Sequence, residues 1–366
     1  MPQTSYVTSL TEGLFKHSLK RPDGRPLYLY SSDNTPIPQL PLDEARTPPT
    51  PHMRYHALRG QWVMVASHRQ DRTFFPPPEY NPLAPTLPGK MMTEVPYENF
   101  GIAVFENKFP SLAPTDVLPD IANPPSQVAP GDGICEVVVY DADASTLLSE
   151  FSLQKLEHLI WVWRDRVSDL GSRASIDYVL IFENRGEDVG VTLHHSHGQI
   201  YAYPFIPPYL AQELDQVQQH GDILGKLVAH DLADKTRLVY ENECWAILVP
   251  FWARYPFETY TIPKRLHTNL TSLSKPEMTS LADALNTLVS AYDRIFDKIM
   301  PYVMAIQQAP SPVPLWDNYR MRIEILPRLR TESKLKFLAG TEVAAGAFAV
   351  DALAEDYAQT LRDALS

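Results

Sequence analysis

Three histidines and a glutamine stand close together in the segment HHSHGQ at residues 194–199. The surrounding stretch, 191–203, is rich in residues that favour strands, and a strand places alternate side chains on one face. We therefore expect His195, His197 and Gln199 to share a face. The serine and glycine between them leave room for the backbone to approach another group closely. Two imidazoles and an amide in a row are typical of a site that handles phosphate or metal.

This row of residues favours attack of an imidazole on phosphorus. At its ordinary pKa, most of a histidine population is neutral at pH 7 and therefore nucleophilic. Attack on a phosphoanhydride gives a covalent phospho-histidine, which divides one difficult transfer into two easier ones. The amide of Gln199 can hydrogen-bond a phosphoryl oxygen without supplying the proton that would favour hydrolysis. The pair therefore indicates a transferase.

Metal binding is the alternative for these histidines. His194, His195 and His197 are of a suitable type, but zinc would require further cysteine, histidine or carboxylate ligands. The chain has only two cysteines, Cys135 and Cys244, which lie far apart in sequence. That number also excludes a disulfide framework and a four-cysteine zinc site.

The overall composition is that of a soluble globular protein. The chain has 366 residues, of which 44% are hydrophobic and 21% charged, enough for two ordinary domains. Its formal net charge of −12 argues against nucleic acid as a partner, because a phosphate backbone requires clustered lysine and arginine. No signal peptide or long apolar run is evident, so we expect a cytoplasmic protein with no membrane partner.

Two parts of the chain repeat one order of elements. In the first, we expect strands at 101–106 and 135–140, a helix capped by Ser152 that ends near 170, and strands at 177–183 and 191–203. In the second, we expect strands at 245–249 and 259–262, a helix from Ser274 to about 299, and strands at 302–307 and 319–326. The repeat predicts an α+β fold of two similar halves, each an antiparallel sheet with a helix packed on it.

The boundaries follow from this repeat and from proline clusters. Residues 1–50 lack sustained periodicity, and we interpret them as an N-terminal arm laid over the body or over a partner subunit. We assign 51–216 to the half that carries the nucleophile and 217–366 to the second half. The counterpart of the histidine strand, 321–325, keeps the alternation but contains no histidine. The chemistry is therefore expected in the first half only.

Several motifs together resemble the galactose-1-phosphate uridylyltransferase family, which belongs to the histidine-triad superfamily and is built from two such halves. The matching segments are Arg54-Tyr55, Gly60-Gln61-Trp62, Arg69 with Arg72, Phe105 to Pro110, Phe182 to Gly186, Gly190 to Thr192, His195 to Gln199, Trp245 to Pro263 and Lys334 to Glu342. Their agreement in spacing is more specific than the histidine motif alone.

The resemblance implies a reaction and a set of site residues. His197 would take UMP from UDP-glucose and release glucose 1-phosphate, after which galactose 1-phosphate would leave as UDP-galactose. Gln199 would hold the α-phosphoryl group. The other implied substrate contacts are Arg69 and Arg72 at the phosphates, Asn107, Lys108 and Asn184 near the nucleoside, Gly190, Val191 and Thr192 along the phosphate path, His195 in the motif, and Lys336, Phe337 and Glu342 at the hexose phosphate. The arginine segment reaches across to the partner subunit in the family, which implies a homodimer.

The metal sites of the family look degraded in this sequence. Its Cys-x-x-Cys motif corresponds to Asn81 to Ala84, and the remaining zinc ligands would be His195 and a residue near Asp143. With both thiolates missing, tight zinc binding is not expected. A second family site uses a glutamate and three histidines, and the matching positions here are Glu213, Gln307, Arg322 and Glu324. We expect Arg322 to pair with Glu213 or Glu324 in place of the ion, and no metal or other cofactor.

Other departures from the family pattern leave alternatives open. Ser196 stands for a usual proline, Lys108 for an acid near the nucleoside, and Phe348 for a glutamine near the hexose. They are compatible with a specialised relative that uses another nucleotide or sugar phosphate. A nucleoside-diphosphate-sugar phosphorylase, with inorganic phosphate as the acceptor, is a second enzymatic alternative. A non-catalytic relative that binds nucleotide sugars is a third, against which the intact His197 and Gln199 argue.

Overall fold

The structure, a computed structural model, describes residues 4–43, 46–70, 80–311 and 316–365. Its centre is a 12-stranded sheet in the order β1-β2-β3-β6-β8-β10-β9-β14-β15-β13-β12-β11, with antiparallel neighbours throughout. The strands of the first half are β6 (Ile102–Glu106), β8 (Ile134–Val139), β9 (Tyr178–Arg185) and β10 (His197–Tyr203). Those of the second half are β12 (Trp245–Leu248), β13 (Thr259–Pro263), β14 (Tyr302–Gln307) and β15 (Arg322–Pro327). The α+β fold of two similar antiparallel halves is confirmed.

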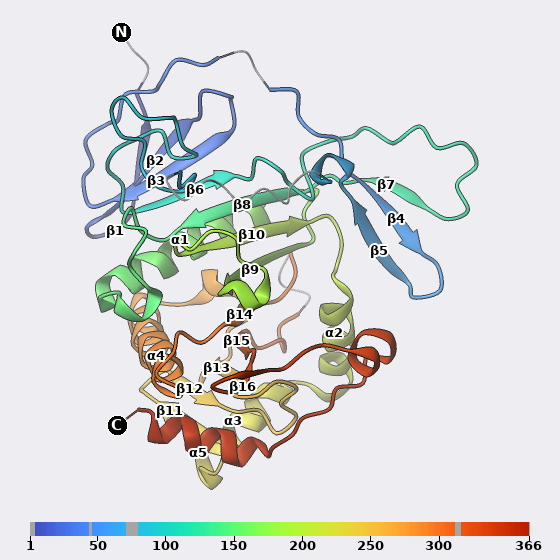
Figure 1. The fold of residues 1–366 in the computed structure, drawn as a ribbon. Helices are drawn as coiled ribbons and strands as arrows, with labels where there is room; N and C mark the ends of the chain where they lie inside the picture. Colours follow the sequence, from blue (N-terminus) through green and yellow to red (C-terminus); the bar gives the residue numbers. More distant parts are fainter. Residues whose placement is uncertain (1–3, 44–45, 71–79, 312–315, 366) are drawn as a thin grey trace.

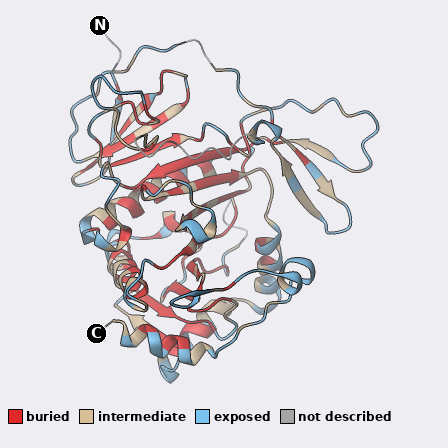
Figure 2. Ribbon diagram, viewed as in Figure 1, coloured by how far each residue is buried: buried red, intermediate tan, exposed pale blue. Residues whose placement is uncertain are grey.

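The two halves meet in mirrored order. The first contributes β6-β8-β10-β9 and the second β14-β15-β13-β12, so that β9 pairs with β14 at the junction. Strand β10 is the second strand from the junction in the first half, and β15 is the second strand from the junction in the second half. The long helices α1 (Leu153–Gly171) and α4 (Lys275–Arg294) pack against each other and share one core with the sheet. Figure 2 shows how deeply the central strands are buried.

The helix starts lie where their capping residues predict. The hydroxyl of Ser152 accepts a hydrogen bond from the Lys155 amide, and Ser274 forms a capping box with Glu277. The end of the second helix was predicted less well. Helix α4 ends at Arg294, and Ile299, which we placed on its apolar stripe, lies beyond the helix and is 49% exposed.

Part of the segment 1–50 that we interpret as an N-terminal arm, residues 6–31, has regular structure. They form β1 (Tyr6–Thr11), β2 (Leu14–Lys20) and β3 (Pro26–Ser31), and β3 pairs with β6 at the edge of the first half. The buried side chains of these three strands come in short runs, such as Leu27 and Leu29. The runs are too short to produce sustained periodicity. Figure 1 shows this extension in blue, next to β6 and β8.

The remaining elements surround the sheet. They are β4 (His52–His56), β5 (Gln61–Val65) and β7 (Val128–Pro130) in a separate three-stranded sheet, β11 (Leu238–Glu241) at the far edge, the small pair β16 (Leu329–Thr331) and β17 (Lys334–Leu335), and the helices α2 (Pro208–His220), α3 (Ile223–Asp234) and α5 (Ala354–Asp363). The boundary that we placed between 216 and 217 falls inside α2. Among the described residues, no helix combines the length and apolar character required to cross a bilayer.

Candidate active site

Strand β10 positions the residues of the histidine motif. The strand begins at His197, not at residue 191 as predicted, so the alternation extends over His197, Gln199 and Tyr201 only. Both His197 and Gln199 line a cavity of about 370 Å³. His195 precedes the strand and is buried, with 2% of its surface exposed. The expectation that His195 shares a face with His197 and Gln199 assumed one strand through all three residues, and only His197 and Gln199 lie on that strand.

The cavity lies on the side of the sheet formed by the first half. Its other lining residues are Tyr80, Pro82, Leu83, Glu94, Phe105, Asn107, Lys108, Phe109, Val137, Thr192 and Leu193. Most of these side chains are apolar or aromatic, with a few polar groups among them. Such a lining is typical of a small-molecule site.

Hydrogen bonding fixes the tautomer of His197. Its Nδ1 lies 2.7 Å from the carbonyl oxygen of His195, and a carbonyl can only accept, so Nδ1 carries the proton. The lone pair of the neutral ring is therefore on Nε2. Burial of the ring lowers the pKa of His197, although the His195 carbonyl acts in the opposite direction. The imidazole is thus neutral at physiological pH, with a defined nucleophilic nitrogen.

The backbone between His197 and Gln199 lies directly against the core. A Cβ atom built on Gly198 would lie 2.3 Å from the hydroxyl oxygen of Tyr140 and 3.1 Å from the Phe182 carbonyl oxygen. Any side chain at position 198 would push the strand out of the sheet. The close approach expected for this glycine is confirmed, and it fixes where the nucleophile and the amide stand.

Comparison with known proteins gives this geometry a family context. The sequence matches the model of the N-terminal domain of galactose-1-phosphate uridyl transferase over residues 41–207 and that of its C-terminal domain over 206–366. The chain belongs to this family. The family membership confirms the expected enzyme class, a nucleotidyltransferase that acts on sugar phosphates.

Individual relatives agree with the family assignment. The galactose-1-phosphate uridylyltransferase of Thermotoga maritima is 34% identical over 319 residues, which cover 85% of this chain and 98% of the relative. That of Haemophilus influenzae is 33% identical over 85% of this chain and 94% of the relative. A solved uridylyltransferase structure superposes with a TM-score of 0.76 at 29% identity and covers 86% of this chain and 98% of the other.

The structure brings some of the residues implied by the family resemblance to the cavity and leaves others away from it. His197, Gln199, Asn107, Lys108 and Thr192 line the cavity. Of the other predicted substrate contacts, the described residues Arg69, Asn184, Gly190, Val191, His195, Lys336, Phe337 and Glu342 are not part of its lining, and Arg72 lies outside the described residues.

Several of these other residues can be placed. Arg69 lies close enough to Tyr201 for its charge to counter the rise that burial causes in the pKa of that tyrosine, and Tyr201 is on the same face of β10 as His197. Asn184 lies on β9, paired with Val303 of the neighbouring half. In the C-terminal segment, Lys336 Nζ donates to Glu342 Oε1 at 2.7 Å, and Phe337 is 69% exposed.

Sequence reasoning missed Glu94 and the residues around Tyr80 as parts of the cavity wall. Both come from a proline-rich stretch without a strand or helix period, where a pattern cannot assign a face. The sequence offers one chemical signal for Glu94. It is a carboxylate that stands between two prolines, ahead of the strand that leads to Asn107.

The residues at the first family metal position do not fit zinc. His195 Nε2 lies 2.7 Å from the Asp141 carbonyl oxygen, and its Nδ1 lies 3.0 Å from the side-chain amide nitrogen of Asn81. Because the carbonyl oxygen accepts, Nε2 carries the proton and donates to it. The lone pair of Nδ1 accepts a hydrogen bond from the Asn81 amide, so the ring has no electron pair left for a metal. The hydrogen bond of Asn81 to His195 thus fixes this loop, whereas in a zinc site a thiolate at this position would fix it through the metal.

The residues at the second family metal position do not fit a metal either. Arg322 Nη2 lies 2.6 Å from Glu213 Oε1 and 3.5 Å from Glu324 Oε2. The expected pairing of this arginine with Glu213 or Glu324 is confirmed, and the guanidinium group contacts both carboxylates. A guanidinium group thus supplies the positive charge at this position. Among the described residues, no three histidine, cysteine or acidic side chains form a group that could hold a metal ion.

A buried carboxyl group lies beneath the catalytic strand. Glu183, on β9, is 4% exposed, and the hydroxyl of Tyr302 lies 3.4 Å from its Oε1. The side chain of Tyr140, which packs against Gly198, also borders Glu183. Burial raises the pKa of Glu183 to about 7, and Arg185 only partly offsets this effect.

We expect Glu183 to make stability depend on pH. Because its pKa is higher in the folded state, its contribution is fully present below its ordinary pKa and is lost as the pH rises through about 7. On the order of 3 kcal/mol should be lost between pH 5 and pH 8. Urea unfolding of Glu183→Gln should show a much flatter pH dependence. Glu187→Gln, at an exposed site just beyond the same strand, should retain the wild-type slope, and equal slopes in all three proteins would contradict the assignment.

Proposed function

We propose that this protein moves UMP from UDP-glucose to galactose 1-phosphate by a ping-pong mechanism through a covalent uridylyl-His197. The observation that carries the proposal is the fixed tautomer of His197 in the cavity wall, since Nδ1 is held by the His195 carbonyl at 2.7 Å. The relatives with more than 30% identity are named for the same activity.

In the first step, His197 Nε2 attacks the α-phosphorus of UDP-glucose. The N–P bond forms as the bond to the bridging oxygen breaks, and glucose 1-phosphate leaves with the electron pair. The proton stays on Nδ1, where the His195 carbonyl stabilises the positive charge of the ring. In the second step, a phosphate oxygen of galactose 1-phosphate attacks the same phosphorus, and the electron pair returns to Nε2. No proton has to enter or leave the site.

Gln199 supports the intermediate between these steps. Its side chain lines the same cavity, two residues further along the strand. We assign its amide to the α-phosphoryl oxygens, because an amide N–H stabilises negative charge without becoming an acid that could protonate a leaving group. The intermediate can then last until the acceptor arrives.

We further propose that the active form is a cytoplasmic homodimer and that it requires no bound metal. Lys336, Phe337 and Glu342 lie outside the cavity of their own chain, and the large exposed side chain of Phe337 favours a contact with a second copy. Neither family metal position has ligands that fit. Metal analysis of the active protein should therefore find far less than one zinc or iron per chain, and stoichiometric metal would contradict this part of the proposal.

Intact-mass spectrometry tests the covalent intermediate. Mixing the protein with UDP-glucose should add the mass of one uridylyl group, and galactose 1-phosphate should then remove it with formation of UDP-galactose. Inorganic phosphate in place of galactose 1-phosphate provides the phosphorylase test, because release of UDP would identify that activity instead. If no nucleotide sugar, including ADP- and GDP-glucose, gives an adduct, the covalent mechanism is wrong.

A further inference from the structure

A carboxylate stands in the wall of the cavity with one oxygen unused. The side chain of Glu94 is 16% exposed and lines the cavity together with His197 and Asn107. Its Oε2 accepts a hydrogen bond from Arg25 Nη2 at 2.8 Å and lies 3.4 Å from Arg21 Nη1. No side chain or amide of the described residues donates to its other oxygen, Oε1. Both arginines bind Oε2, which leaves the lone pairs of Oε1 to a ligand.

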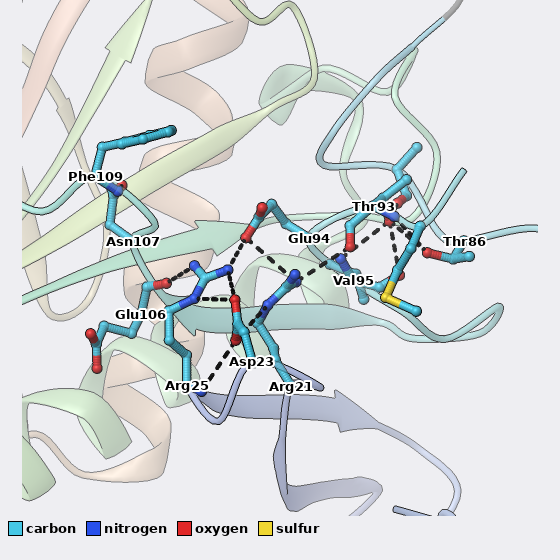
Figure 3. A network of polar contacts seen from close by, with 12 residues as sticks. Arg21, Asp23, Arg25, Thr86, Thr93, Glu94, Val95, Glu106, Asn107 and Phe109 are labelled. Atoms are coloured by element: carbon cyan, nitrogen blue, oxygen red, sulfur yellow. Dashed lines mark hydrogen bonds and ion pairs between the residues drawn. The ribbon is translucent and has the colours of Figure 1, made fainter. Parts of the chain in front are cut away.

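The two arginines come from the N-terminal extension. Arg21 and Arg25 flank the turn between β2 and β3, which precedes residue 41, where the match to the family model starts. Asp23, in the same turn, accepts from Arg25 Nη2 at 2.7 Å and from its Nε at 2.9 Å, so the guanidinium group has a fixed orientation. Figure 3 shows this guanidinium group between Asp23 and Glu94.

The same arginine also supports the opposite wall of the cavity. Arg25 Nη1 donates to the backbone oxygen of Glu106 at 2.7 Å, and Glu106 is the last residue of β6, directly before Asn107. Asn107 is 7% exposed, and its Oδ1 accepts from the Phe109 amide at 2.8 Å. Among the described residues, no acceptor uses the side-chain N–H groups of Asn107. The guanidinium group of Arg25 thus positions two groups in one cavity, the acceptor Oε1 of Glu94 and the side-chain N–H donors of Asn107.

The charge of Glu94 decides which part of a ligand it can face. A carboxylate repels phosphate groups, so Oε1 cannot contact the diphosphate. Glu94 Oε1 can instead accept a hydrogen bond from an uncharged part of the ligand that carries O–H or N–H donors. The rings of Tyr80, Phe105 and Phe109 line the same cavity and suit a planar base. These neighbours favour the nucleoside over the hexose as the part that lies beside Glu94.

We propose that Glu94 is a specificity-determining residue that accepts a hydrogen bond from the nucleoside of the bound nucleotide, next to the amide donor of Asn107. The donor is a ribose hydroxyl or an N–H of the base, which present the same chemistry to a carboxylate. This inference rests on the proposed function, since it takes the cavity to bind a nucleotide sugar. It gives the N-terminal extension a role at the site, because Arg21 and Arg25 orient Glu94.

The test compares Glu94→Gln with Glu98→Gln. The glutamine at position 94 would turn its oxygen towards Arg25 and present an amide donor to the cavity, where the ligand requires an acceptor. Glu98 is exposed, belongs to the same segment and does not line this cavity, so the same change there should have no effect. Thermal unfolding should show that both variants are folded, since neither removes a buried apolar group.

Calorimetric titration with UMP, which has no hexose, should show binding about tenfold weaker for Glu94→Gln, which corresponds to about 1.4 kcal/mol. The rate of nucleotidylation at saturating UDP-glucose should change little. If 2′-deoxy-UMP shows no such loss, the donor is the 2′-hydroxyl, and an equal loss with both ligands assigns the donor to the 3′-hydroxyl or the base. Unchanged UMP binding, or a loss seen with UDP-glucose alone, would overturn the inference. Absence of any adduct in the wild type would instead overturn the proposed function.

Discussion

Replacement of His197 by glycine or asparagine should abolish the exchange of labelled glucose 1-phosphate into UDP-glucose, by about 10⁴-fold or more. The reason is that the bond-forming atom itself is lost, whereas Gln199 and the rest of the cavity wall remain. Asparagine retains a polar side chain at the site but offers no nucleophilic nitrogen. Both variants should still bind UMP, because the nucleoside contacts lie elsewhere in the cavity.

The matched control for this experiment is His194→Asn. His194 belongs to the same motif, but its side chain is 80% exposed and its Nε2 lies 3.4 Å from an exposed glutamate. Exchange and adduct formation should therefore be preserved in this variant. Rapid exchange in His197→Gly, with a mass adduct still present, would mean that another group is the nucleophile. Loss of exchange in both variants would point to a fold defect, which thermal unfolding would reveal.

The fold was predictable where local chemistry determines local structure. The capping residues at Ser152 and Ser274 set the helix starts, and the repeated order of elements gave the two halves. The strands of residues 6–31 escaped prediction because they are held by pairing, β1 with β2, β2 with β3 and β3 with β6. Pairing between distant segments depends on the whole chain and leaves little periodicity within any one of them.

The sequence predicted two residues of the cavity, His197 and Gln199, but not most of its walls. The motif identified His197 and Gln199, because their chemistry depends on residue type and spacing within a single strand. His195 lies outside the strand, which starts at residue 197 and not at residue 191 as we predicted. Its ring instead joins Asn81 and Asp141, which are distant in sequence. Glu94 could not be found from a pattern at all, since its place depends on arginines some 70 residues away.

The duplicated fold gives a reason to expect the chemistry in one half only. Strand β15 occupies in the second half the place of β10, and its first residue is Arg322, whereas β10 begins with His197. Arginine keeps its proton at every physiological pH and cannot act as a nucleophile. Its guanidinium group instead forms the centre of a buried charge network. Burial alone would raise the pKa of Glu213, but Arg322 outweighs that effect and lowers it.

Replacement of Arg322 by methionine should therefore destabilise the protein by about 1–3 kcal/mol, because it removes the cation beside Glu213, whose side chain is 34% exposed and therefore partly screened by solvent. Glu324 keeps a second partner in Arg254, so the double variant Arg322→Met with Glu213→Gln should recover most of the loss. Arg330→Met, which breaks an exposed pair with Asp351, should cost less than about 1 kcal/mol. Urea unfolding measures these differences. At a temperature where every variant is folded, nucleotidylation should proceed at the wild-type rate, since the network lies outside the catalytic cavity. A lower rate in the rescued double variant would show instead that this network takes part in the reaction.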